Sequence, residues 1–171
     1  TRQMKIASNY GTAIGKGDLV KRVNDGTIER DGSTSAFPAT GTLGVFMGCS
    51  YTDPNTKQLT FNNQYPGSIV ASDIHAFVVD DPDAVFLMNA DQSFVRADLY
   101  KNYSLSNTTG VTQTGISKVQ LDVSVSGVAT TFAVQAIDIS QDPENSDVTT
   151  SNANILVRIN NHFYRSGTGL A

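Results

Sequence analysis

Residues 43–79 read LGVFMGCSYTDPNTKQLTFNNQYPGSIVASDIHAFVV and run directly into an acidic turn at residues 80–83. Two strongly apolar runs, Val45–Tyr51 and Ile74–Val79, flank a polar connection that is rich in Asn, Gln, Pro and Gly. Short apolar runs bounded by turn residues are typical of buried β-strands. The stretch therefore predicts two core strands around an exposed connection, which a short strand at Gln58–Phe61 interrupts.

The rest of the chain continues this β-pattern on both sides. Asn24-Asp25-Gly26 separates two short β-prone runs and supplies the positive φ of a tight hairpin. Four later runs have the composition or alternation of strands: Ala84–Met88, Lys118–Val125, Thr131–Ile139 and Asn154–Ile159. Residues 93–105 have either a helical spacing or the pattern of a strand with a short helical turn. We expect an all-β fold, an antiparallel barrel or sandwich with at most one or two short helices.

Composition restricts the class of protein further. The chain has 171 residues, enough for one domain with a core that needs no disulfide or metal. We expect a single β domain over residues 12–171, preceded at residues 1–11 by either a first strand or an arm that orders against a neighbour. The net charge of −4 and the scattered basic residues disfavour nucleic-acid binding. No apolar run approaches the roughly 20 residues of a membrane span, so we expect a soluble chain without a membrane partner.

The residue types that usually carry chemistry do not form a reactive pattern. Cys49 is the only cysteine, and its apolar neighbours predict a buried packing thiol. His75 lies in an apolar run and His162 in a polar tail, without the spacing of a zinc site. Asp80, Asp81 and Asp83 surround Pro82, which predicts a turn more strongly than a calcium loop. We therefore expect no catalytic residue, no metal and no cofactor.

Several sequence segments, taken in order, resemble a known class of viral protein. Residues 14–20, IGKGDLV, together with Asp25–Ile28, resemble the opening of the decoration or cement proteins on tailed-bacteriophage heads. Residues 44–53, residues 76–83 and the closing VRIN with His162 resemble virion proteins of marine and cyanobacterial podovirus-type phages. The resemblance covers most of the chain and rests on strand and turn patterns.

This resemblance implies a β-rich protein, of the barrel kind called a β-tulip, on the outer surface of a capsid assembled in the host cytoplasm. The implied partner is the major capsid protein, the implied assembly is a homo-oligomer with a trimer favoured, and the family implies no catalytic residues. Residues in the N-terminal segment and in the 52–72 connection are then the expected capsid contacts. These residues are Arg2, Met4, Ile6, Tyr10, Phe61, Tyr65 and Pro66.

Three other functions stay open on the sequence. A carbohydrate-binding module on the virion surface would use displayed Tyr and Asn side chains. A tail or collar component would share the same β-rich composition. A hydrolase would need the carboxylates of Asp80–Asp83 and His75 on opposite sides of a cleft.

Overall fold

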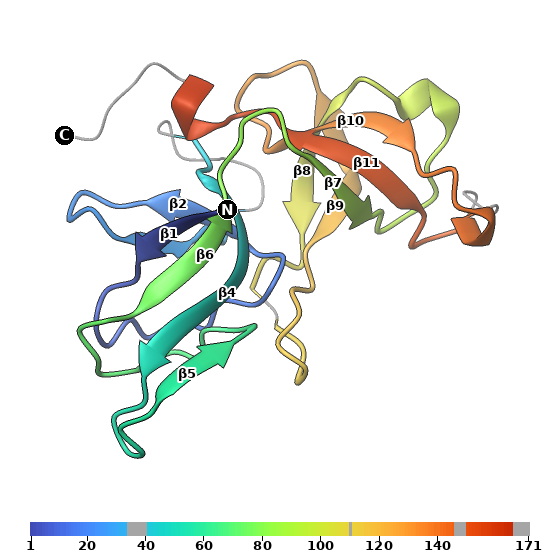
Figure 1. Ribbon diagram of the computed structural model, residues 1–171. Helices are drawn as coiled ribbons and strands as arrows, with labels where there is room; N and C mark the ends of the chain where they lie inside the picture. The colour runs from blue at the N-terminus through green and yellow to red at the C-terminus, as the bar shows by residue number, and fades with distance from the viewer. Residues whose placement is uncertain (34–40, 110, 146–149, 166–171) are drawn as a thin grey trace.

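The computed structural model describes residues 1–33, 41–109, 111–145 and 150–165, and these ranges contain eleven strands in two antiparallel sheets (Figure 1). Strands β1 to β6 come from the first half of the chain and form one sheet, and β7 to β11 from the second half form the other. The predicted all-β class is confirmed. Within the described ranges, no helix is long and apolar enough to cross a membrane.

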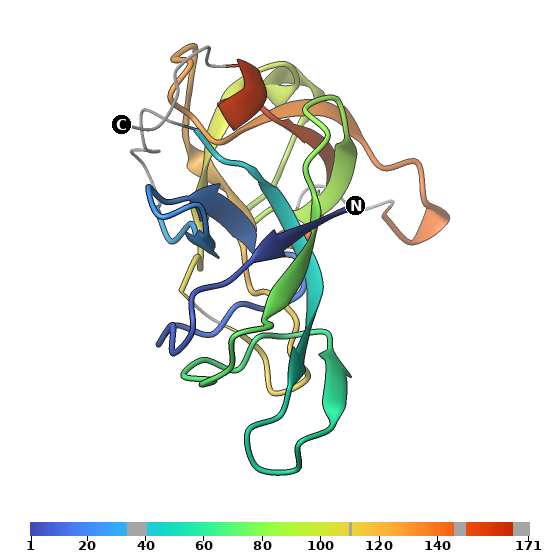
Figure 2. The ribbon, with the colours of Figure 1, turned by 60° about the vertical axis from the view of Figure 1, so that its left-hand side comes forward.

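The first sheet has the order β1-β6-β4-β2-β3, with β5 paired to the far end of β4. Its strands are β1 (Arg2–Lys5), β2 (Leu19–Arg22), β3 (Ile28–Arg30), β4 (Gly44–Thr52), β5 (Leu59–Asn62) and β6 (His75–Val79). A parallel bridge between Ile6 and Ile28 brings the two ends of this order together, so the sheet curls around its own core. Figure 2 shows the β4–β5 hairpin projecting from the end of the molecule.

The second sheet has the order β7-β11-β10-β8-β9. Its strands are β7 (Val85–Asn89), β8 (Asn102–Ser106), β9 (Gln120–Gly127), β10 (Val134–Ile139) and β11 (Asn154–Ile159). A parallel bridge between Ala90 and Leu121 again joins the two outer strands. Three single 3₁₀ turns complete the described elements: η1 (Arg96–Asp98), η2 (Pro143–Asn145) and η3 (Phe163–Arg165).

Each sheet has its own apolar cluster, and the two clusters meet. Phe46 and Tyr65 are among the large side chains buried in the first sheet, and Phe94 and Tyr103 are among those of the second. Leu19 and Val45 belong to first-sheet strands, yet they pack into the second cluster. The two halves of the chain therefore share packing across their junction.

Local sequence patterns place most strands as expected. The hairpin at residues 24–26 joins β2 to β3, and the short strand expected at Gln58–Phe61 is β5. Residues 93–105 form one 3₁₀ turn followed by β8, so the strand alternative holds and the helical one does not. The reason is that Tyr103 and Leu105 alternate into the core of the second sheet, which a helix would prevent.

The N-terminal segment takes the first of its two expected forms. Residues 2–5 are the strand β1, which pairs with β6 so that Met4 lies opposite Ala76. Met4 and Ile6 are buried in the first core. This segment is thus part of the sheet in the isolated chain.

Candidate binding surface

Strand β5 is an edge strand whose outer side is unpaired among the described residues. The Asp53 N–H donates to the Gln58 carbonyl at 2.9 Å. This bond shows which residue pairs of the β4–β5 ladder are hydrogen-bonded to each other and which are not. Residues of an antiparallel pair point their backbone groups alternately toward and away from the partner strand. By this alternation, Leu59 and Phe61 direct their N–H and C=O groups away from β4.

The same two residues expose their side chains. Leu59 is 61% exposed and Phe61 is 70% exposed, and both lie on the outer face of the sheet, opposite Thr52 and Ser50. An edge that offers free backbone groups and apolar side chains together is a template for an added strand. We call this surface, formed by Leu59 and Phe61, the β5 edge.

Strand β7 offers a second edge at Val85 and Leu87, before the chain meets β9 at the Ala90–Leu121 bridge. The Ala90 N–H donates to the Ala153 carbonyl at 2.8 Å, so this pair of residues is hydrogen-bonded across the β7–β11 ladder. Because hydrogen-bonded and non-bonded pairs alternate, the backbone groups of Val85 and Leu87 point away from β11. Leu87 is 60% exposed, close to the value for Leu59. The β7 edge lies in the second sheet, whereas the β5 edge lies on the projecting hairpin (Figures 1 and 2).

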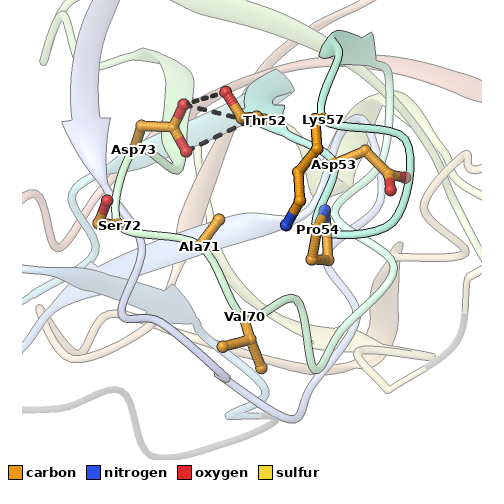
Figure 3. Close-up of a pocket in the computed structure, with 8 residues that line it drawn as sticks. All are labelled: Thr52, Asp53, Pro54, Lys57, Val70, Ala71, Ser72 and Asp73. Carbon is orange, nitrogen blue, oxygen red and sulfur yellow. Dashed lines mark hydrogen bonds between the residues drawn. The ribbon is translucent and has the colours of Figure 1, made fainter.

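A hollow of about 470 Å³ lies beside the β4–β5 turn (Figure 3). One wall comes from the turn that joins the two strands, and the other from the segment that leads into β6. The lining residues are Thr52, Asp53, Pro54, Lys57, Val70, Ala71, Ser72 and Asp73. Val70 is mostly exposed, but most of the other lining residues are polar, so the hollow differs in character from the apolar β5 edge.

The two carboxylates of this hollow are engaged in local structure. Asp73 accepts the Thr52 hydroxyl at 2.6 Å and the Thr52 N–H at 3.2 Å, and these bonds lower the pKa of Asp73. Asp53 accepts the N–H groups of Thr56 and Asn55 at 3.0 and 2.7 Å, which lowers its pKa as well. Both groups are ionised acceptors at neutral pH. They fix the shape of the hollow and are poorly suited to donate a proton.

Three of the expected contact residues are buried within the chain, so their contact with a partner stays a prediction that their burial does not favour. Met4 and Ile6 face the first core because they occupy the inward positions of the β1 segment. Tyr65 is fully buried, and its hydroxyl donates to the Tyr10 carbonyl at 2.8 Å. An isolated run of aromatic and proline residues does not reveal this burial, because the contacts that cover Tyr65 come from residues 10 and 14.

The other four expected contact residues reach the surface to different degrees. Phe61 and Pro66 are exposed, and Tyr10 is half-buried with its hydroxyl accepting the Arg30 N–H at 3.3 Å. Arg2 is exposed, but its guanidinium is paired with Asp80 at 3.1 Å and lies over the Tyr164 ring. A capsid contact for these four residues stays a prediction.

His75 and the acidic turn do not form a common site. His75 begins β6 and the acidic turn follows the end of the same strand, so about 16 Å of extended chain separates them. The His75 Nδ1 atom contacts the Asp73 carbonyl, and Asp81 accepts the Asp83 N–H within the turn. Among the described residues, no group of three or more His, Cys, Asp or Glu side chains is arranged to hold a metal ion.

Sequence reasoning missed Leu59, Val70 and the β7 edge. The sequence shows that the apolar residues Leu59 and Phe61 alternate with polar ones. Only the pairing with β4 shows that both side chains face outward and that the strand has no second neighbour. Comparisons of this chain with family models, curated proteins and solved structures gave no match.

Proposed function

We propose that this protein is a structural component of a phage virion that binds the outer surface of the capsid. In this proposal each copy contacts major capsid subunits through the β5 edge and so cements the shell. The observation that carries the proposal is the coincidence of exposed apolar side chains and outward backbone groups at Leu59 and Phe61. The resemblance of the chain to decoration proteins supplies the identity of the partner.

The β5 edge suits a partner that presents an extended segment. An added strand would donate and accept backbone hydrogen bonds with Leu59 and Phe61, while its side chains cover theirs. One short strand contributes modest affinity, but many copies on a repeated lattice add their binding free energies to the stability of the shell. The resemblance favours a trimer, which would multiply the contacts again and is measurable as a mass in solution.

The experiment is cosedimentation with shells assembled from the major capsid protein of the phage that encodes this chain. Leu59→Ala removes apolar contact area, and Leu59→Pro keeps apolar bulk but removes the outward N–H. We expect each to weaken binding about tenfold, since a lost contact of about 1.4 kcal/mol corresponds to that factor. Phe61→Ala should act in the same direction.

Leu87→Ala and Leu87→Pro are the matched controls, because Leu87 has nearly the same exposure and the same outward backbone in an edge strand. They should bind shells like the unchanged protein. Loss of binding in the Leu87 variants alone would overturn the assignment to β5. Failure of the unchanged protein to bind shells, with labelling on tails or collars instead, would overturn the capsid role.

A further inference from the structure

Tyr100 is held in a backbone conformation that its residue type disfavours. Its φ is +66°, and among the described non-glycine residues with positive φ it is the only aromatic one. The left-handed region is unfavourable for a bulky residue, whereas Gly or Asn adopts it easily. The conformation is fixed by the Tyr100 N–H, which donates to the Ala136 carbonyl at 2.9 Å.

The ring of Tyr100 gains no burial in exchange for this strain. The residue is 74% exposed, beside Val128, which is 98% exposed. Figure 1 places this region at the start of β8, close to the last residue of β9 and the beginning of β10. The fold therefore displays one aromatic face to solvent from a rigid backbone position.

A hollow of about 500 Å³ lies next to this ring, and we call it the Tyr100 hollow. Asn102, Gly127 and Gln135 line it from β8, β9 and β10, where register places Asn102 between the other two. A side chain at position 127 would meet the Phe132 ring at 3.0 Å, so Gly127 leaves room for that ring behind the hollow. Its size lies within the range of ligand sites in proteins.

The polar groups of the Tyr100 hollow are amides with unused hydrogen-bonding capacity. Asn102 is only 8% exposed, its Nδ2 donates to the Ala129 carbonyl, and its buried Oδ1 has no hydrogen-bond partner among the described residues. Gln135 accepts the Arg158 Nε–H and donates one amide hydrogen to the Tyr100 carbonyl. One amide hydrogen of Gln135 is then left for a ligand.

The charge of this site is balanced. Lys101 is the one charged residue that lines the hollow, and its ammonium is paired with Asp98 at 2.8 Å. A site of this kind offers an anionic ligand no unpaired cation. It combines instead an aromatic face with neutral donors and acceptors, which matches a ligand that has an apolar C–H face and hydroxyl groups at its edge.

We propose that the Tyr100 hollow binds a neutral pyranose residue of a glycan, stacked on the Tyr100 ring with its hydroxyl groups toward Gln135 and Asn102. The site is on the second sheet and does not depend on the capsid contact at the β5 edge. A displayed ring with a fixed backbone loses little conformational entropy on binding, which explains why a strained tyrosine is present where glycine would relieve the strain.

The test uses the full chain with methyl α- and β-pyranosides of the gluco, galacto and manno configurations, followed by an array of neutral and anionic oligosaccharides. Saturation-transfer NMR should show ring protons of at least one neutral sugar in contact with the protein. Tyr100→Ala should weaken that binding about tenfold or more, and Tyr100→Phe should retain it within about threefold.

Tyr100→Gly separates binding from folding. It should abolish binding while the melting temperature stays equal to or above that of the unchanged protein, because glycine relieves the positive-φ strain. Phe61→Ala, an aromatic truncation on the other sheet, should bind sugar normally. Absence of any neutral sugar ligand, binding of anionic glycans or peptides alone, or full binding by Tyr100→Ala would overturn the proposal.

Discussion

The buried carboxylate of Asp18 accepts the hydroxyl hydrogen of Ser117, which lies 99 residues further along the chain. Its other oxygen accepts the Gly15 N–H at 2.8 Å, and the Arg30 guanidinium lies 3.9 Å away. Burial raises the pKa of Asp18, and these three partners oppose that rise. One ionisable group of the first half of the chain is thus held by a hydroxyl of the second half.

Ser117→Ala should destabilise the protein by about 1.5–3 kcal/mol at pH 7, the range for a hydrogen bond to a charged group. The variant raises the pKa of Asp18 further, because the largest stabilising partner of the carboxylate is lost. The ionised form makes the stronger bond to this hydroxyl, so the penalty should shrink as pH falls toward the raised pKa. Urea unfolding from pH 7 to pH 3 measures this loss of stability, with Ser8→Ala, at an exposed position, as the control. Equal stability of Ser117→Ala and the unchanged protein at pH 7 would contradict the assignment.

His162 should make the protein less stable in mild acid. It is fully buried and its Nδ1 accepts the Tyr164 N–H. Burial lowers its pKa, although the Asp80 carboxylate and a backbone hydrogen bond at Leu43 oppose this shift. The folded state therefore binds a proton less readily than the unfolded chain, whose histidine titrates near 6.5. Stability should be full above that pH and decline as pH falls through 6.5 toward the folded pKa.

The measurement is the urea midpoint from pH 8 to pH 5. His162→Gln should be less stable at pH 8 but should lose most of this decline, whereas His75→Gln, at a half-buried position, should keep it. An unchanged slope in His162→Gln would show that other groups cause the decline.

The β1 segment should be needed for folding. Met4→Ala should cost about 2–5 kcal/mol because it empties a core position, while the neighbouring exposed Lys5→Ala should stay within about 0.5 kcal/mol. Deletion of residues 1–6 should lower stability more than either, since it also removes the ladder to β6. Chemical denaturation of the three variants checks this, and a deletion variant as stable as the full chain would restore the view of this segment as a separable arm.

Cys49 should be unreactive in the folded protein. Burial raises the pKa of its thiol to about 12, and the Sγ–H donates to the Gln64 carbonyl. The thiolate that attacks disulfide reagents is therefore scarce at pH 8. Labelling with an aromatic disulfide should proceed only at the rate of unfolding, while a Leu59→Cys variant, exposed on β5, should gain one rapidly labelled thiol. Fast labelling of Cys49 without denaturant would contradict its burial.

The sequence alone determined the features that depend on near neighbours in the chain. Turn residues at 24–26 set the β2–β3 hairpin, and the apolar runs around 45–51 and 74–79 became β4 and β6, because strand patterns and turn chemistry act over a few residues. The buried thiol of Cys49 followed from the same local reasoning.

Only the tertiary structure decided which side chains are covered and which strand edges are open. Met4 is buried because β1 pairs with β6, and Tyr65 because residues 10 and 14 close over it. Leu59 is exposed because its pairing with Thr52 places its side chain on the outer face, and its backbone is open because β5 has one neighbour. Tyr100 likewise has its positive φ in a turn whose N–H is bonded to Ala136 in β10. Each of these outcomes depends on contacts between distant parts of the chain, and the local pattern of residues does not predict those contacts.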